Sequence, residues 1–162
     1  MSVLHVFKSL PIARQVHREG ALPHGARAYP RDTITLGWED RLKARGRRRS
    51  DRGLEFGTAL PRGSILCAGD CFVLPSPAVV IAVVERDEPV FVVEPRTPAE
   101  WGRFAYFIGN SHQPVMITDR AIVCPDLPGM EQVLTYHGIA FSRSTQPFTP
   151  VGLVLDHQHP PR

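Results

Sequence analysis

The fold of this chain is decided by residues 97–118, where a segment with a helix start passes into a strand. The stretch reads Thr97-Pro98-Ala99-Glu100-Trp101-Gly102-Arg103-Phe104-Ala105-Tyr106-Phe107-Ile108-Gly109-Asn110-Ser111-His112-Gln113-Pro114-Val115-Met116-Ile117-Thr118. A threonine followed three residues later by glutamate is a capping pattern, and proline suits the first turn, so we predict a helix over 98–108. Glycine and asparagine tolerate left-handed backbone at a helix end, so His112 should project from an ordered corner.

Strands and helices continue on both sides of this stretch. Apolar runs predict strands at 79–85 and 90–94 before it, and at 115–119 and 121–125 at its end and beyond. A second helix is predicted over 128–137, stopped by Gly138, and a last strand over 139–143. The order of strands, helix, two strands, helix and strand predicts a ferredoxin-like α+β domain over residues 76–146.

The region before residue 76 is rich in short strands and turns. Alternating apolar residues predict strands at 3–7, 33–36, 53–57, 64–67 and 71–74. Such a series predicts a small β-barrel or sandwich over residues 1–75. Pro75-Ser76-Pro77 is predicted to be the linker between the two domains, and the proline-rich residues 147–162 are predicted to form an extended tail.

Composition places the chain among ordinary globular proteins. It has 162 residues, 43% hydrophobic and 22% charged. The longest apolar runs, such as residues 78–84, are too short to span a bilayer, and Lys8 and Arg14 interrupt any signal-peptide core. We therefore expect a cytoplasmic protein without a membrane partner. Three cysteines leave one unpaired and favour a reducing compartment; Cys67 and Cys71 could face each other across a turn, whereas Cys124 lies in a buried-strand pattern.

Basic residues crowd one short span of this weakly basic chain, whose formal charge is +3. They are Arg41, Lys43, Arg45, Arg47, Arg48, Arg49 and Arg52. Residues 41–45 alternate basic with apolar, as a half-buried strand does. No aromatic residue lies within the span to stack on bases, so a solvated face or a docking surface for an acidic protein is favoured over a nucleic-acid site.

Histidines supply the candidate chemistry. Besides His112, the run Asp156-His157-Gln158-His159 places two imidazoles at alternate positions of an extended tail, where both could grip one ion. Imidazole suits zinc, copper and nickel, and no thiolate pair of a structural zinc site lies near. The chain has no Gly-x-Ser-x-Gly, phosphate-binding glycine loop or His-Glu-x-x-His motif, so we expect a metal carrier and not an enzyme.

An ordered set of segments resembles the UreE-type urease accessory proteins. The segments are residues 45–57, Leu60-Pro61-Arg62-Gly63, Gly69-Asp70, residues 106–112 with Gly109-Asn110-Ser111-His112, and Gln146-Pro147-Phe148. The resemblance implies an N-terminal β-domain and a ferredoxin-like second domain. It also implies a homodimer through the second domain with His112 at the two-fold axis. The implied function is delivery of nickel to urease, with urease apoprotein and accessory proteins including the GTPase as partners.

The resemblance leaves part of the metal site open. Many members carry a long histidine-rich tail, whereas this chain offers only His157 and His159, which could close over an ion held by two copies of His112. Zinc and copper are expected to compete with nickel. His137 precedes Gly138 at a predicted helix end, where a histidine also suits the helix dipole. The alternative is a non-catalytic RNA- or protein-binding adaptor that acts through the Arg41–Arg52 face.

Overall fold

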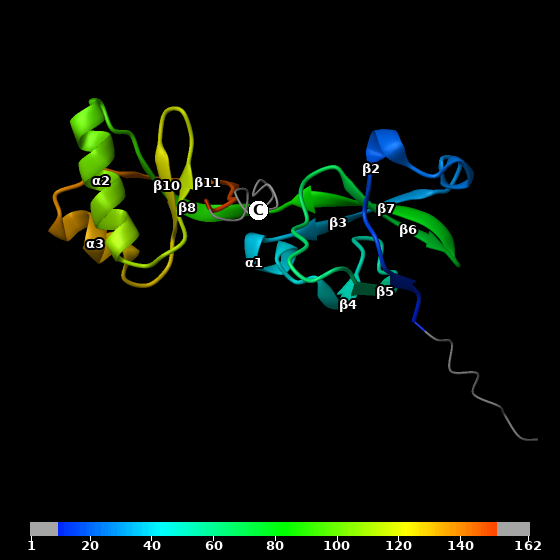
Figure 1. Ribbon diagram of the computed structural model, residues 1–162. Helices are drawn as coiled ribbons and strands as arrows, with labels where there is room; N and C mark the ends of the chain where they lie inside the picture. Colours follow the sequence, from blue (N-terminus) through cyan, green and yellow to red (C-terminus); the bar gives the residue numbers. More distant parts are fainter. Residues whose placement is uncertain (1–9, 152–162) are drawn as a thin grey trace, which may run out of the picture. The chain divides into compact units, whose positions relative to one another are not determined.

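The computed structural model describes residues 10–151, and the chain divides into two compact units that meet between Glu85 and Arg86 (Figure 1). The first unit ends ten residues later than the predicted boundary, because Pro75-Ser76-Pro77 is not a linker. Strand β6 (Asp70–Pro75) pairs antiparallel with β7 (Ala78–Glu85), and Pro75 lies opposite Ala78. Residues 76 and 77 therefore form a hairpin turn inside the first unit. The predicted strand at 3–7 lies outside the described residues.

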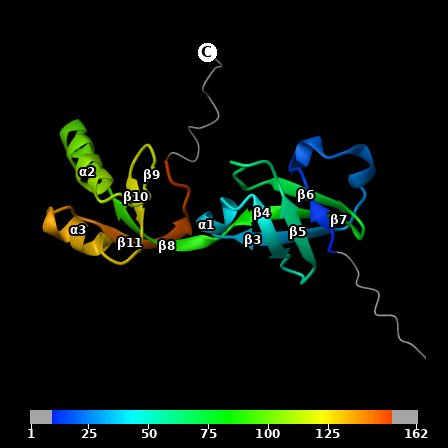
Figure 2. The same cartoon turned by 60° about the horizontal axis from the view of Figure 1, so that its bottom comes forward.

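The first unit contains two sheets. The elements besides β6 and β7 are β1 (Ile12–Ala13), β2 (His17–Arg18), β3 (Arg31–Leu36), α1 (Trp38–Arg41), β4 (Arg45–Arg49) and β5 (Glu55–Ala59), with 3-10 turns at Glu19–Ala21 and His24–Ala26. One sheet has the strand order β1-β5-β4, and the other has the order β2-β6-β7-β3. Figure 2 shows β4 and β5 lying across β3 and β7.

Side chains from both sheets meet in one core, which makes the unit a sandwich. Phe56 of β5 contacts Phe72 of β6, with ring centroids 5.4 Å apart, and both rings are fully buried. Ile34 and Ile81, on β3 and β7, join the same cluster. The expected β-rich first domain is thus confirmed, as two facing sheets. The predicted strand at 64–67 was wrong, because those residues form a loop.

From residue 86 onward the second unit has the predicted order of elements, whereas the predicted strand at 79–85 belongs to the first unit as β7. It contains β8 (Asp87–Val93), α2 (Pro98–Asn110), β9 (Met116–Ile117), β10 (Ile122–Pro125), α3 (Met130–Tyr136) and β11 (Ser142–Pro147). The sheet order β11-β8-β10-β9 is antiparallel throughout. This is the ferredoxin-like α+β arrangement, and the prediction of that fold is confirmed.

Both helices of the second unit pack on the same face of its sheet. Phe91 of β8 lies opposite Cys124 of β10, and both side chains point into one cluster because cross-strand partners share a face. Ile108 of α2 and Leu134 of α3 complete that cluster, and all four residues are fully buried. Within residues 10–151, no helix combines the length and the apolar character that crossing a bilayer requires.

The start of α2 forms as the capping pattern predicts. The Thr97 hydroxyl accepts a hydrogen bond from the Glu100 amide at 3.1 Å, and the Glu100 carboxylate accepts one from the Arg96 amide at 2.7 Å. Two otherwise unpaired donors at the helix start are thereby satisfied. These local contacts fix where α2 begins, and the helix is 13 residues long and ends at Asn110.

Candidate metal site

His112 lies at an ordered corner immediately after α2. The helix continues through Gly109 and Asn110, so neither residue adopts the left-handed backbone that we predicted for them. Ser111 caps the helix, and its hydroxyl donates to the Ile108 carbonyl at 2.6 Å. His112 itself takes the left-handed conformation, with φ of 56°, and its amide donates to the Gly109 carbonyl at 3.1 Å. Histidine is among the side chains that tolerate this region better than most.

The corner presents the imidazole to solvent, because His112 is exposed. Its main chain is fixed by the hydrogen bond to the last turn of α2, so the side chain leaves a defined backbone position. Within residues 10–151, no three histidine, cysteine or carboxylate side chains gather closely enough to hold a metal ion. His112 is thus a single exposed imidazole within the described part of the chain. The predicted ligands His157 and His159 lie outside the described residues.

His137 occupies a different environment from His112. It caps α3, as predicted, and its ring stacks on Phe107 of α2 at 3.9 Å with an interplanar angle of 11°. Tyr136 meets the same imidazole edge-on, with ring centroids 4.9 Å apart. This stacking joins the ends of the two helices, so His137 has a structural role in this unit.

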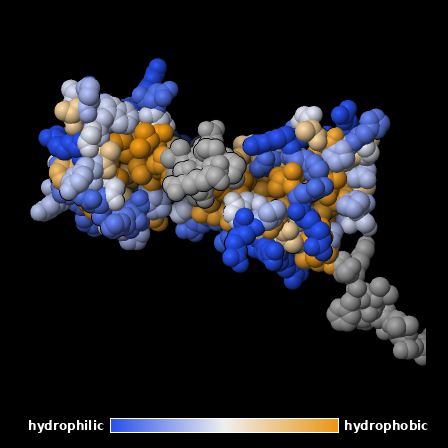
Figure 3. Space-filling model, in the orientation of Figure 1, coloured by the Kyte–Doolittle hydropathy of each residue, from blue (hydrophilic) through white to orange (hydrophobic). Residues whose placement is uncertain are grey.

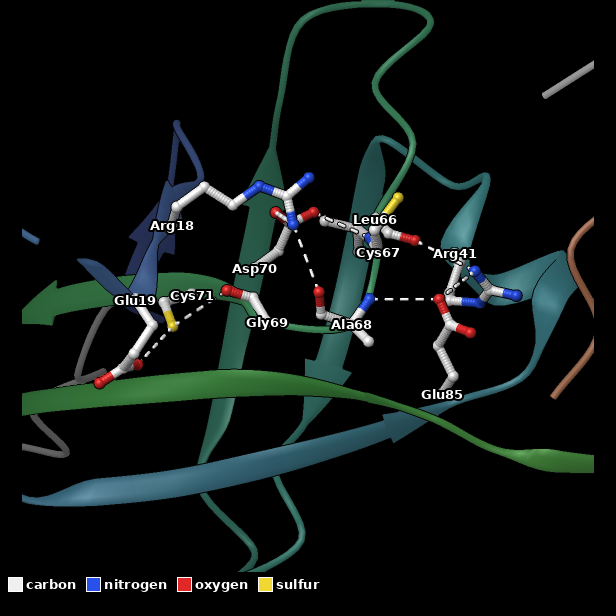
Figure 4. Close-up of polar contacts among 10 residues, drawn as sticks. All are labelled: Arg18, Glu19, Arg41, Leu66, Cys67, Ala68, Gly69, Asp70, Cys71 and Glu85. Atoms are coloured by element: carbon white, nitrogen blue, oxygen red, sulfur yellow. Dashed lines mark hydrogen bonds and ion pairs between the residues drawn. The ribbon is translucent and has the colours of Figure 1, made fainter. Parts of the chain in front are cut away.

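The basic span is not a single exposed face, which corrects our interpretation of the alternation at 41–45. Arg41 belongs to α1 and is only 1% exposed. Its guanidinium contacts the Glu85 carboxylate at 2.9 Å and the Leu66 carbonyl at 3.4 Å (Figure 4). Arg48 also points inward and donates to the Thr58 hydroxyl and to the carbonyls of Asp40 and Lys43. Two of the arginines on which the adaptor hypothesis rests, Arg41 and Arg48, are therefore buried.

The loop before β6 is held by hydrogen bonds to carboxylates, and not by the backbone pairing of a strand. Glu85 accepts a hydrogen bond from the Ala68 amide at 3.2 Å, and Asp70 accepts one from the Cys67 amide at 2.8 Å (Figure 4). Arg18 pairs with Asp70 at 3.0 Å and also donates to the Ala68 carbonyl. The contacts of Arg18 and Glu85 with Ala68 have no local signal in the sequence, because these partners are 50 and 17 residues away, whereas Asp70 is only three residues from Cys67. The network explains why residues 64–67 are ordered without forming a strand.

The cysteines are all free thiols. The Cys71 thiol is buried and donates to the Glu19 carboxylate at 3.2 Å; burial and the neighbouring charge raise its pKa to about 11. Burial alone raises the pKa of Cys124 on β10 to about 12. Cys67 is half-buried.

Thiol reactivity should separate these three residues. Because the thiolate is the reactive form, Cys71 and Cys124 should react slowly at about pH 8, and a chromogenic disulfide should modify Cys67 first. Reaction of Cys71 should accelerate as the pH rises towards 11, since its thiol then ionises. Cys67→Ser should abolish the fast phase, and guanidinium chloride should make every remaining thiol reactive. Equal fast reaction of all three native thiols would contradict this assignment.

Comparison with known proteins gives the same family for both units. Residues 12–85 match the family model of the UreE urease accessory protein, N-terminal domain, and residues 88–161 match that of its C-terminal domain. The junction between the two matches coincides with the division after Glu85. The two matched regions together cover most of the chain.

Individual relatives carry the same name. The chain is 34% identical over 114 residues to the urease accessory protein UreE of Streptococcus vestibularis. The matched region covers 70% of this chain and 75% of that protein. The chain is 33% identical over 118 residues to the Burkholderia vietnamiensis protein of that name, covering 73% and 58%. The Azorhizobium caulinodans protein of that name is 35% identical over 119 residues, covering 74% and 57%. The two matched domains and these relatives show that the chain belongs to the UreE family of urease accessory proteins.

Proposed function

We propose that this chain is a nickel-binding metallochaperone that delivers Ni(II) for assembly of the urease active site. The observation that carries the proposal is the exposed imidazole of His112, held at a defined corner after α2 in a urease accessory protein. Neutral imidazole is a good ligand for nickel. In this role nickel is the cargo, and the protein is a carrier and not a catalyst.

A homodimer through the second unit would complete the site. One His112 side chain supplies one ligand, whereas a two-fold axis brings the same residue from a second copy to the same ion. His157 and His159 of the tail would add ligands from one or both chains. A site with few imidazole ligands and a removable cover has moderate affinity, which suits a protein that must release its metal.

The proposed partners are urease apoprotein and the urease accessory proteins, including the GTPase. Zinc and copper would compete for the same imidazoles, and copper has the higher intrinsic affinity. Delivery of nickel then depends on geometry and on the partner that accepts the ion. We place the protein in the cytoplasm, where reducing conditions suit its three free thiols.

Calorimetric nickel titration tests the proposal through a replacement that respects the backbone at position 112. His112→Gly removes the imidazole while accepting the left-handed conformation, whereas alanine would add strain there. We expect about one tight ion per wild-type dimer and a loss of affinity of more than about 100-fold in the variant, because even outer-shell changes cost 10–100-fold. Binding should also weaken at acidic pH, since a protonated imidazole cannot ligate.

Matched controls distinguish ligand loss from misfolding. His24→Ala removes an exposed histidine of the first unit and should leave the titration unchanged. Light scattering should show the same dimer for His112→Gly as for wild type. The double variant His157→Ala, His159→Ala should weaken nickel binding less than His112→Gly does. If His112→Gly bound nickel as wild type does, the two-fold site would be abandoned.

A further inference from the structure

Among the arginines of strand β4, Arg48 points inward, and its contacts hold the strand in a fixed register against β5. Arg48 lies opposite Phe56 of β5, and both side chains are buried. The Arg48 guanidinium donates to Thr58, the next inward-facing residue of β5. Because strand side chains alternate between faces, Arg45, Arg47 and Arg49 must all lie on the outer face. The structure shows these three residues exposed.

The outer face of the β1-β5-β4 sheet therefore carries a row of guanidinium groups. Arg47 pairs with Glu55, whose carboxylate lies on the same face. Among residues 10–151, no carboxylate pairs with Arg45 or Arg49. Opposite Arg45 and Arg47, β5 carries Ala59 and Gly57. Figure 3 shows strongly hydrophilic side chains gathered over the part of the first unit where Figure 1 places β4 and β5.

An apolar groove adjoins this charged row. It has a volume of about 520 Å³ and is lined by Leu10, Pro11, Ile12, Leu54, Glu55, Leu74 and the turn residues 75–77. Ile12 and Glu55 belong both to the groove and to the outer face, because Ile12 lies opposite Gly57 in the sheet. Ile12 remains 49% exposed although it is a large aliphatic side chain. The groove and the arginines are therefore parts of one continuous surface.

We infer that this outer face and its groove form a docking surface for an acidic segment of a partner protein that carries an apolar side chain. Carboxylates of the segment would pair with Arg45 and Arg49, and one aliphatic or aromatic side chain would enter the groove beside Ile12. Arginine suits this role because its planar fork binds carboxylates in a bidentate manner. Charge on an edge strand also opposes the addition of a further strand, so the segment would lie over the face.

The same surface is poorly suited to RNA or DNA. Single-stranded nucleic acid is bound by basic residues together with aromatic rings on which bases stack. Among residues 10–151, the exposed side chains of phenylalanine, tyrosine or tryptophan are Tyr106 and Tyr136, which both belong to the second unit. The groove is instead aliphatic, and Glu55 at its border would repel a phosphate. An acidic peptide with an apolar anchor satisfies both parts of the surface.

Fluorescence anisotropy with short labelled peptides tests this inference on the full chain. The probe is a peptide of glutamate and leucine, compared with a glutamate–serine peptide, a lysine–leucine peptide and oligouridylate. We expect the glutamate–leucine peptide to bind most tightly and to weaken as salt is raised. The triple variant Arg45→Gln, Arg47→Gln, Arg49→Gln should lose at least about tenfold in affinity. Ile12→Ser should reduce the preference for leucine over serine.

Controls separate this surface from general charge and from the metal site. The triple variant Arg27→Gln, Arg103→Gln, Arg120→Gln removes equal charge from exposed positions elsewhere and should bind the peptide as wild type does. Nickel titration should be unchanged in both triple variants, so this inference and the metal site can fail separately. Equal losses in the two triple variants, or tighter binding of oligouridylate, would overturn the docking surface.

Other occupants of the groove would also overturn the inference. If the full chain bound no peptide but a chain lacking residues 1–9 did, the chain's own first residues would fill the groove. If Ile12→Ser changed the mass seen by light scattering, a second copy would cover it. Unchanged mass and peptide binding by the full chain support the partner segment.

Discussion

Replacement of Arg41 by methionine is expected to destabilise the first unit by about 3 kcal/mol. Removing one partner of a buried ion pair costs roughly 3–5 kcal/mol, and the lower value applies because the Glu85 side chain keeps 20% exposure. The loss has a second part, since the Leu66 carbonyl loses a donor and the loop around Ala68 depends on the same carboxylate. Methionine keeps much of the buried volume, so the change is mainly electrostatic.

Tryptophan fluorescence can assign this loss to one unit. The chain has two tryptophans, Trp38 in the first unit and Trp101 in the second. With Trp101→Phe as background, denaturant unfolding followed through Trp38 should shift strongly in Arg41→Met. The exposed pair Arg47–Glu55 provides the control, and Arg47→Met should cost less than about 1 kcal/mol.

The Arg41 prediction has a clear point of failure. Adding Glu85→Gln to Arg41→Met should recover part of the stability, because it removes the unpaired charge. Equal effects of Arg41→Met and Arg47→Met would show that the buried pair contributes no more than a surface pair.

Phe91→Ala is expected to destabilise the second unit by about 3–5 kcal/mol, the range for removal of a buried phenylalanine. Phe91 is fully buried on β8, which lies between β11 and β10. Its ring contacts Phe141 edge-on at 5.1 Å, and the Arg143 guanidinium lies over it at 4.8 Å. Alanine would leave a cavity at the centre of the cluster that supports α2, and hence the position of His112.

The readout again uses the two tryptophans. In a Trp38→Phe background, Phe91→Ala should lower the denaturant midpoint seen by Trp101; in a Trp101→Phe background, Trp38 should report no change. Under the proposed function, nickel binding should be lost in this variant at denaturant concentrations at which the wild-type chain still binds nickel. Ile117→Ala, on the edge strand β9 and 49% exposed before substitution, is the control with a small effect. Equal shifts at both tryptophans would mean that the units unfold together.

The second unit could be predicted from sequence because its signals are local. Thr97 and Glu100 mark the start of α2 within one turn, and the apolar runs around Phe91 and Ile122 mark the strands that carry the buried cluster. His112 was predicted to project from an ordered corner, and it is exposed at the corner that follows α2. The roles of His112, His157 and His159 as metal ligands stay predictions.

The errors in the first unit arise from contacts between residues distant in sequence. Arg41 and Glu85 are 44 residues apart, so an alternation around Arg41 could not show that the guanidinium is buried. The strand at 78–85 belongs to the first unit because it pairs in parallel with β3, and such pairing leaves no mark near Pro75. The proline pair therefore marked the end of a strand but could not distinguish a hairpin turn from a linker.

The left-handed backbone at His112 has a consequence for the evolution of the chain. Glycine or asparagine would satisfy that backbone at least as well as histidine does, so the stability of the helix end does not require an imidazole. Selection for folding alone would let the histidine drift to either residue. Under the proposed function, a relative that lost this imidazole would lose its cargo while remaining fully folded, and only selection on the delivered metal would retain the ring.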